Sequence, residues 1–235
     1  MPNLDGKIIA IAGAGGGLGP PGAGRLAGAG ATLALTDVDQ GRLDAVAEGL
    51  GLPEDRLDVR VVDLLSDDAA RDWAAALTER FGKVDALLHL VGGWKGGEPL
   101  ATAPLADYEW LHDLLVRTVQ HASRAFHDAL AHDGGRFVLV SSTQAQAPSG
   151  TNAAYGAAKA AAEAWTLALA DSLAESGATA NIVVVNAILT PQMREENPDK
   201  PFKTFTSTDD IAEAIAYLLS DAAAKMNGAR VELHP

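Results

Sequence analysis

Three polar residues in the middle of the chain have the types and spacing of an acid–base site. Ser142 ends the apolar run RFVLVSS, and Tyr155 and Lys159 follow in an alanine-rich stretch. A tyrosine and a lysine at positions i and i+4 share one face of a helix. A lysine ammonium beside a phenol favours the phenolate and lowers the tyrosine pKa toward neutral pH. The serine hydroxyl can then hold a substrate oxygen while Tyr155 moves the proton.

The spacing of Tyr155 and Lys159 is common by chance, and alone it fits a purely structural helix. Ser142 makes the set more specific, because it lies thirteen residues before Tyr155 at the end of a predicted strand. Ligands of doubly wound sheets bind at the carboxyl ends of the strands. We therefore predict that Ser142, Tyr155 and Lys159 are the catalytic residues.

A second group of residues, near the N-terminus, has the composition of a phosphate-binding turn. The segment from Ala12 to Gly19 reads AGAGGGLG and directly follows the first apolar run. Glycines let the backbone turn sharply and approach a pyrophosphate closely, and the next helix N-terminus attracts that anion. A glycine cluster can also be only a flexible turn. Its position between a predicted strand and a predicted helix favours dinucleotide binding.

Asp37 ends the second predicted strand, 20 residues after Gly17. A carboxylate at this point can accept hydrogen bonds from both adenosine ribose hydroxyls, and it repels a 2′-phosphate. No lysine or arginine lies between positions 14 and 24 or between positions 36 and 40 to bind such a phosphate. The alternative is a solvated loop aspartate. We expect NAD(H) to be favoured over NADP(H).

Apolar, β-branched runs alternate with alanine-rich stretches, and this alternation predicts the elements that position these residues. Continuous apolar runs such as IIAIA and IVVV fit a parallel sheet covered on both faces. We predict an α/β fold, a Rossmann-type doubly wound, seven-stranded parallel sheet with helices on both faces. The predicted strands are 7–12, 31–36, 58–62, 86–91, 136–141, 181–185 and 230–233. The predicted helices are 18–28, 39–49, 66–81, 105–131, 152–176 and 208–220.

Length and composition predict a single domain over residues 1–235. The chain has 31 acidic and 18 basic residues, and its net charge of −13 disfavours nucleic acid and anionic membranes. It has no cysteine for a disulfide or thiolate site, and its histidines lack a metal-binding spacing, so we predict no metal. Neither a signal peptide nor a membrane span is expected, which indicates a cytoplasmic location. Residues 190–207 are expected to form an irregular substrate-side loop.

The motifs together resemble the short-chain dehydrogenase/reductase family over essentially the full chain. The resemblance rests on Gly13-x-x-x-Gly17-x-Gly19, Asp37, Asp63-Leu64, Ser142, Tyr155-x-x-x-Lys159 and Thr190-Pro191. It implies hydride transfer between a nicotinamide and a carbonyl or alcohol substrate, with Tyr155 as the acid/base. It also implies that Lys159 binds the nicotinamide ribose and tunes Tyr155, and that Ser142 orients the small-molecule substrate. The implied cofactor-binding residues are Gly13, Gly17, Leu18, Gly19, Asp37, Asp63, Leu64, Val91, Gly92, Tyr155, Lys159, Ile188 and Thr190.

The family resemblance further implies a homodimer or homotetramer that forms through the helices 105–131 and 152–176. Several small residues make the second of these helices smooth enough for close packing, although alanine also favours an isolated helix. No step of the predicted chemistry depends on this assembly. The oligomer is therefore a separate expectation.

Four positions depart from the family pattern. His89-Leu90-Val91-Gly92 replaces Asn-Asn-Ala-Gly, and Leu115 aligns with an asparagine that supports a proton-relay water. Val185-Asn186 replaces Pro-Gly, and Ala12 replaces a threonine. Leu115 calls the usual proton route into question but leaves the serine, tyrosine and lysine in place. His89 is expected to be a core or cofactor-side residue.

Two segments, 86–97 (ALLHLVGGWKGG) and 190–199 (TPQMREENPD), resemble dihydropteridine reductase and its bacterial relatives. Those enzymes use NADH to reduce a planar quinonoid pterin, so an alternative function is reduction of a planar quinonoid or imine. We predict Trp94 and Ser142 as substrate residues: Trp94 either stacks on a flat ring or packs beneath its own loop. Ser142 departs from the dihydropteridine reductase pattern and fits a carbonyl or alcohol better.

A third hypothesis is a catalytically idle dinucleotide-binding protein that acts as a redox sensor or partner-binding module. The lost asparagine and Pro-Gly motivate it. The intact Ser142, Tyr155 and Lys159 count against it.

Overall fold

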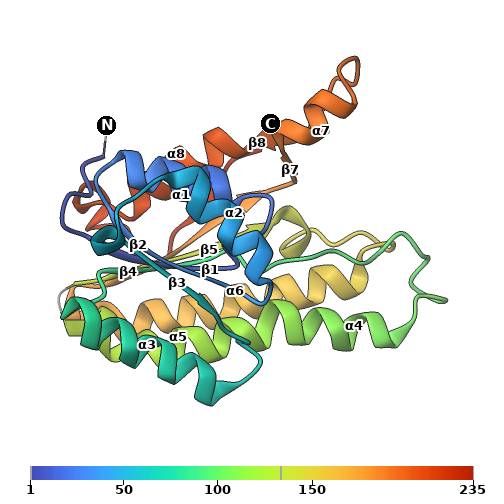
Figure 1. The fold of residues 1–235 in the computed structure, drawn as a ribbon. Coiled ribbons are helices and arrows are strands. Elements are labelled where there is room, and N and C mark those ends of the chain that lie inside the picture. Colours follow the sequence, from blue (N-terminus) through green and yellow to red (C-terminus); the bar gives the residue numbers. More distant parts are fainter. Residues whose placement is uncertain (1, 133, 235) are drawn as a thin grey trace.

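The computed structural model describes residues 2–132 and 134–234 and is built around a seven-stranded parallel sheet (Figure 1). The strand order is β3-β2-β1-β4-β5-β6-β9, and every neighbouring pair is parallel. The predicted doubly wound, seven-stranded architecture is therefore confirmed. The strands are β1 (Ile8–Ala12), β2 (Thr32–Asp37), β3 (Leu57–Val61), β4 (Ala86–His89), β5 (Arg136–Ser142), β6 (Thr179–Val185) and β9 (Arg230–Glu232).

Helices cover both faces of the sheet (Figure 1). One face carries α1 (Gly19–Gly28), α2 (Gln40–Leu50) and α8 (Thr208–Leu218), and the other carries α3 (Asp67–Phe81), α4 (Leu105–His112), α5 (Thr118–His132) and α6 (Ala153–Leu173). Buried apolar side chains fill each interface; on the second face the rings of Trp73 and Phe126 meet edge-on at 4.9 Å. The central strands are buried on both faces, which explains their continuous apolar runs.

Local signals set the helix ends. In α3 the Ser66 hydroxyl accepts a hydrogen bond from the N–H of Ala69, and Gly82 ends the helix in the left-handed region. Asp67 and Asp68 lie in the first turn of this helix, where carboxylates interact favourably with the helix dipole. These signals lie close to the helix ends in the sequence, so the bounds of α3 agree with the predicted helix 66–81 to within one residue.

Two segments differ from the prediction. The helix expected over 105–131 is α4 followed by a π-helical turn, Asp113–Arg117, and then α5. The segment expected to be an irregular loop over 190–207 contains a short helix, α7 (Pro191–Glu196), and a strand, β8 (Phe205–Ser207). That strand pairs in parallel with β7 (Ala187–Leu189) in a second sheet. The prediction of an irregular loop was wrong because this strand needs a partner that lies earlier in the chain.

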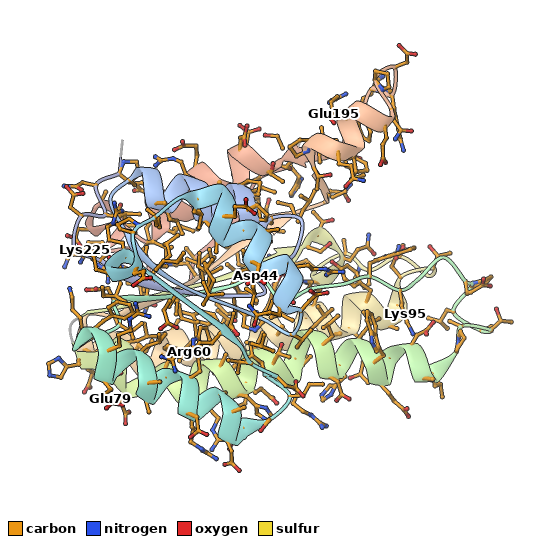
Figure 2. The ribbon with its side chains drawn as sticks, viewed as in Figure 1. Asp44, Arg60, Glu79, Lys95, Glu195 and Lys225 are labelled. Atoms are coloured by element: carbon orange, nitrogen blue, oxygen red, sulfur yellow. The ribbon has the colours of Figure 1, made fainter. Side chains whose placement is uncertain are left out.

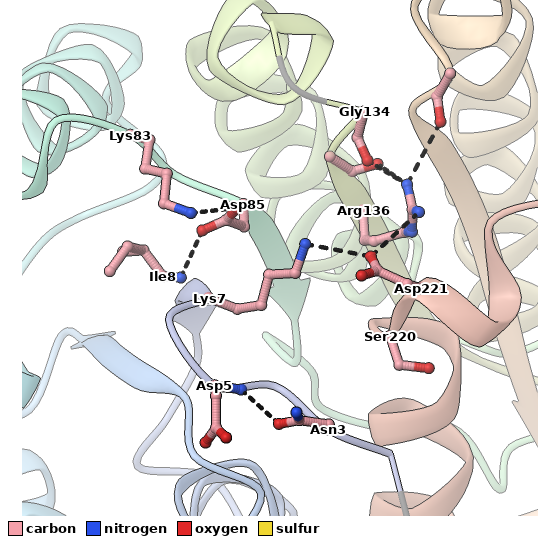
Figure 3. A network of polar contacts seen from close by, with 12 residues as sticks. Asn3, Asp5, Lys7, Ile8, Lys83, Asp85, Gly134, Arg136, Ser220 and Asp221 are labelled. Atoms are coloured by element: carbon pink, nitrogen blue, oxygen red, sulfur yellow. Dashed lines mark hydrogen bonds and ion pairs between the residues drawn. The ribbon is translucent and has the colours of Figure 1, made fainter.

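Charged residues join the elements at the amino edge of the sheet (Figure 3). The Asp85 carboxylate accepts a hydrogen bond from the backbone N–H of Ile8 at 2.7 Å. Asp221 pairs with Lys7 at 3.2 Å and lies 4.0 Å from the Arg136 guanidinium. These contacts hold the starts of β1, β4 and β5 together, at the edge opposite the glycine-rich turn.

No helix in the described part of the chain is both long and apolar enough to span a membrane.

Two glycines of α1 test how tightly the glycine-rich turn is packed. A Cβ at Gly19 would lie 1.8 Å from the carbonyl oxygen of Ala14, whereas a Cβ at Gly24 would meet nothing within 4 Å. We expect Gly19→Ala to lower the free energy of unfolding by about 2 kcal/mol or more, because the turn must distort. Gly24→Ala should raise it by up to about 1 kcal/mol, because alanine favours a helix. Urea unfolding measures both, and equal effects would contradict this packing.

Candidate active site

The predicted site residues converge at the carboxyl edge of the sheet, where they line two adjoining cavities. One cavity, of about 370 Å³, is lined by Gly13, Asp37, Asp63, Leu64, Val91 and Gly92, among others. The other, of about 840 Å³, is lined by Gly13, Gly17, Leu18, Val91, Gly92, Trp94, Ser142, Tyr155, Lys159, Ile188 and Thr190, among others. Of the residues predicted from the sequence, only Gly19 lies behind the cavity walls, where it packs against Ala14. The two cavities share lining residues, among them Gly13, Val91 and Gly92, so they lie next to each other.

The glycine-rich turn that separates the cavities has the form of a phosphate cradle. Gly13 has a φ of +80°, and a Cβ there would lie 2.6 Å from the backbone nitrogen of Val91. A side chain at this position would therefore fill the space between β1 and β4. The N-terminus of α1, with prolines at its first positions, directly follows the turn. Bare backbone beside a helix N-terminus suits a pyrophosphate, so the residues present fit a dinucleotide.

Asp37 lies beside this turn and helps to hold it. One of its carboxylate oxygens accepts a hydrogen bond from the N–H of Gly15 at 3.0 Å, and the other accepts one from Val38 at 2.8 Å. Arg42 lines the same cavity as Asp37, and its guanidinium lies 3.6 Å from the Asp39 carboxylate. This arginine was not predicted from the sequence, because it lies beyond the loop that follows Asp37. Arg42 lies in the first turn of α2, and only the fold brings it to the cavity.

Ser142, Tyr155 and Lys159, the three residues predicted to be catalytic, all line the larger cavity. Ser142 ends β5 and is 2% exposed, while Tyr155 and Lys159 lie on successive turns of α6. The Lys159 ammonium donates a hydrogen bond to the carbonyl oxygen of Val140 at 2.9 Å and lies 5.9 Å from the centroid of the Tyr155 ring. This lysine is 7% exposed, so its charge acts in a region of low dielectric.

The pKa values of this pair differ from the prediction in one respect. Burial raises the pKa of Tyr155 above its ordinary value of 10, and the hydrogen bond with Ser142 lowers it only in part. Lys159 was expected to lower the pKa of Tyr155 toward neutral pH, and this prediction is wrong for the protein by itself. Burial lowers the pKa of Lys159 to about 8, although the nearby Glu163 carboxylate raises it. Desolvation outweighs the effect of Ser142 at Tyr155 and the attraction of the Glu163 carboxylate at Lys159.

The outer walls of the cavity come from two segments that project from the same side of the molecule. In Figure 2, Lys95 marks the segment after β4 and Glu195 marks α7. Trp94 is 60% exposed, and its indole N–H donates a hydrogen bond to the Asn152 side chain at 2.9 Å. The segment is also tied to the start of α6 by a backbone hydrogen bond from Gly97 to Thr151 at 2.8 Å.

The opposite wall is formed by β7, α7 and β8. The Thr190 hydroxyl oxygen accepts a hydrogen bond from the N–H of Met193 and so caps α7. Asn186, which stands where the family pattern has glycine, donates to the carbonyl of Thr204 at 3.1 Å and accepts from the Thr143 hydroxyl at 3.3 Å. Asn186 therefore fastens the segment after β5 to the segment before β8, a function that no sequence pattern indicated.

His89 is fully buried at the end of β4, between Ala12 of β1 and Leu139 of β5. Neither ring nitrogen has a hydrogen-bond partner in the described structure. Burial, and to a smaller extent the charge of Lys159, lower the pKa of His89 to about 3. The expectation of a core or cofactor-side residue agrees with this position.

The chain is similar to known proteins over nearly its full length. Residues 13–233 match the family described as enoyl-(acyl carrier protein) reductase. The chain is 28% identical to 7alpha-hydroxysteroid dehydrogenase of Escherichia coli, over 96% of this chain and 91% of that protein. A second relative is a solved structure from Brucella melitensis, a short-chain dehydrogenase/reductase described as glucose/ribitol dehydrogenase. The two sequences are 31% identical, the match covers 99% of this chain and 97% of that chain, and the TM-score is 0.85.

A further similar structure is 3-ketoacyl-(acyl-carrier-protein) reductase from Brucella melitensis in complex with NADH. It is 26% identical, covers 99% of this chain and 98% of its own, and has a TM-score of 0.87. The chain belongs to the short-chain dehydrogenase/reductase family, whose members bind nicotinamide dinucleotides. It is an oxidoreductase, like the relatives that are named as dehydrogenases and reductases.

The depressed pKa of His89 predicts an acid-sensitive contribution to stability. Its folded pKa is about 3 and its ordinary value is 6.5, so between these values only the unfolded chain takes up the proton. Stability is therefore lost as the pH falls below about 6.5. Between pH 7 and 4.5 we expect His89→Leu to lose about 2–3 kcal/mol less unfolding free energy than the wild type. Urea unfolding at both pH values measures this difference.

The control for this measurement is His127→Leu, which removes an exposed histidine of α5 that contacts Ser172. It should retain the wild-type loss of stability. An identical loss in His89→Leu would mean that His89 takes up its proton in the folded protein.

Proposed function

We propose that the protein is an NAD(H)-dependent oxidoreductase that transfers a hydride between nicotinamide and a carbonyl or alcohol carbon of a small molecule. The observation that carries this proposal is the meeting of Ser142, Tyr155 and Lys159 in one cavity that continues into the glycine-rich cradle. A bound nicotinamide dinucleotide supplies the hydride donor or acceptor. Gly13, Gly17, Leu18 and Gly19 are proposed to form its pyrophosphate site, and Asp37, Asp63 and Leu64 its adenosine site. Val91, Gly92, Ile188 and Thr190 are proposed to hold the nicotinamide half.

In the proposed chemistry the protein's own residues manage one proton. In reduction, the Tyr155 hydroxyl gives its proton to the substrate oxygen as the C–O bond becomes single; in oxidation, the phenolate takes it back. The Ser142 hydroxyl donates a hydrogen bond to the same oxygen and fixes its position. Because burial raises the pKa of Tyr155, the phenolate needs the positive charges of Lys159 and of an oxidised cofactor together. A raised pKa keeps the Tyr155 hydroxyl protonated, so the residue is better suited to donate a proton than to accept one.

The cavity wall indicates what substrate can enter. Lys159 is the one charged residue that lines the larger cavity in the described structure, and the rest of the wall is hydroxyl, amide, backbone or apolar. Trp94, Met193 and Phe205 are among the large apolar side chains that line it. An anionic substrate would find no exposed cation to balance its charge. We propose an uncharged carbonyl compound or alcohol, and the similarity to a hydroxysteroid dehydrogenase supports this chemistry.

A second candidate function is the reduction of a planar quinonoid or imine, which the position of Trp94 favours. Its ring is largely exposed at the cavity wall, where a flat substrate could stack on it. The presence of Ser142 beside Tyr155 in the wall of the same cavity favours a carbonyl or alcohol instead. Assays with NADH and either uncharged cyclic ketones or a quinonoid pterin separate the two candidates.

Removal of the tyrosine hydroxyl should separate chemistry from binding. We expect Tyr155→Phe to lower kcat by at least about 100-fold, because general acid–base catalysis contributes about 10²–10⁴-fold. The affinity for NADH should stay nearly unchanged, because only the hydroxyl is lost. Lys159→Ala should weaken both turnover and binding. Single-turnover hydride transfer and NADH titration measure these effects, and a wild-type rate in Tyr155→Phe would contradict the proposed mechanism.

Asp37 should set the cofactor preference. We expect the wild type to bind NADH more tightly than NADPH, because the Asp37 carboxylate repels a 2′-phosphate. The double variant Asp37→Ser, Val38→Arg should shift the preference toward NADPH. Arg42→Ala is the matched control, because Arg42 is a cation in the same cavity and could attract that phosphate. Fluorescence titration with both cofactors measures the preference; tighter binding of NADPH by the wild type would refute the assignment of Asp37.

We also propose that the protein forms a homodimer or homotetramer through α4, α5 and α6. These helices form one layer on one face of the sheet, and Leu105 and Trp110 are among their exposed apolar residues. Light scattering at micromolar concentration should give at least twice the chain mass. A strict monomer would rule this assembly out.

A further inference from the structure

A buried carboxylate lies directly behind the Tyr155–Lys159 pair. Glu163 is 2% exposed and follows Lys159 by four residues on α6, so Tyr155, Lys159 and Glu163 occupy successive turns of one helix face. Glutamate is rarely buried unless its charge is paired. No sequence pattern indicated a role for this residue.

The Glu163 carboxylate is held by three side chains from three different parts of the fold. One oxygen accepts a hydrogen bond from the Ser141 hydroxyl at 2.6 Å. The other accepts one from the Gln146 amide at 3.1 Å and pairs with the Arg230 guanidinium at 2.9 Å. Ser141 precedes Ser142 at the end of β5, Gln146 lies before α6, and Arg230 begins β9. One carboxylate thus joins the strand that carries Ser142 to the helix that carries Tyr155.

The charge of Glu163 also acts on Lys159. Burial disfavours the ammonium, and the carboxylate offsets part of that cost by raising the pKa of Lys159. The titratable or charged groups around Lys159 are Tyr155 and Glu163 on its own helix and His89 on β4, with Arg230 of β9 beyond Glu163. His89 stays neutral above about pH 3, so it adds no charge at neutral pH. Two charges therefore remain behind Lys159: the Glu163 carboxylate, which favours the ammonium, and the Arg230 guanidinium, which disfavours it.

We propose that Glu163 is a positioning residue of the active site, which keeps Lys159 charged beside Tyr155 and fixes the end of β5 at Ser142. The inference rests on the proposed function of Tyr155 and Lys159. Arg230 has the opposite electrostatic effect on Lys159, because it neutralises part of the carboxylate. The C-terminal strand β9 thereby takes part in setting the charge of the site.

Two variants test the electrostatic part of this inference because they should act in opposite directions. Glu163→Gln keeps the size of the side chain but removes its negative charge and leaves one acceptor oxygen in place of two. Lys159 should then lose its proton at a lower pH, so the fall of kcat/KM at alkaline pH should move down by about one pH unit. Arg230→Gln leaves the carboxylate without its cation, so the same fall should move to higher pH. A purely structural role would not give shifts of opposite sign.

The matched control is Arg60→Gln, which removes an arginine on β3 that pairs with Asp58. It should leave the pH profile unchanged. If Glu163→Gln does not fold, Arg230→Gln decides alone: a shift to higher pH supports the inference, and an unchanged profile overturns it.

A measurement on the protein without substrate separates this inference from the proposed function. NMR titration of the lysine side-chain carbons gives the pKa of Lys159 directly, with its signal assigned by its loss in Lys159→Arg. We expect this pKa to fall in Glu163→Gln and to rise in Arg230→Gln, whether or not any carbonyl compound is turned over. Unchanged values in both variants would overturn the inference. Opposite shifts in a protein that reduces no ketone or imine would uphold the charge relation and refute the proposed function.

Discussion

The hydrogen bond from the Lys159 ammonium to the Val140 carbonyl is the contact on which the site depends. It fastens α6 to β5 inside the protein and places a charged amine where water is excluded. A charge in such a place is stable only if neighbouring groups compensate for its lost hydration. The carbonyl of Val140 and the carboxylate of Glu163 do so only in part, and the pKa of Lys159 settles near 8. The lysine is therefore charged at neutral pH but close to losing its proton.

The carboxylates at the amino edge of the sheet are well compensated, although burial lowers the pKa of Arg136 there as well. At the amino edge Asp85 and Asp221 meet cations or backbone N–H groups within ordinary contact distances. At the carboxyl edge His89 is buried with both ring nitrogens unpaired, and the pKa of Tyr155 is raised by desolvation. Groups whose protonation is perturbed by burial are typical of functional sites. The contacts at the amino edge join the starts of the strands, while the perturbed groups at the carboxyl edge fit the ligand binding and proton transfer that we propose.

Membership of the family defines the class of reaction, and the residues that depart from the family pattern define what is particular to this chain. His89 stands where the pattern has an asparagine, and the buried, apolar Leu115 stands where it has the asparagine of the proton relay. Leu115 lies in a π-helical turn, a feature frequent at functional sites. Asn186 joins the two segments that close the cavity. An idle dinucleotide-binding protein would have no need for a buried lysine that is kept charged beside a tyrosine, so the site as built favours catalysis.

The sequence alone determined the seven strands, the helices on both faces, and the positions of the glycine-rich turn, Asp37, Ser142, Tyr155 and Lys159. These features depend on residues close together in the chain, such as the i, i+4 spacing on α6 or the order of strand, turn and helix. Only the tertiary structure decided the pairing of β7 with β8, the place of Arg42 beside Asp37, and the contacts of Glu163 with Ser141 and Arg230. It also decided the pKa of Tyr155, because desolvation depends on everything that packs around a group. Residues distant in sequence produce these effects, and no local pattern records which of them will meet.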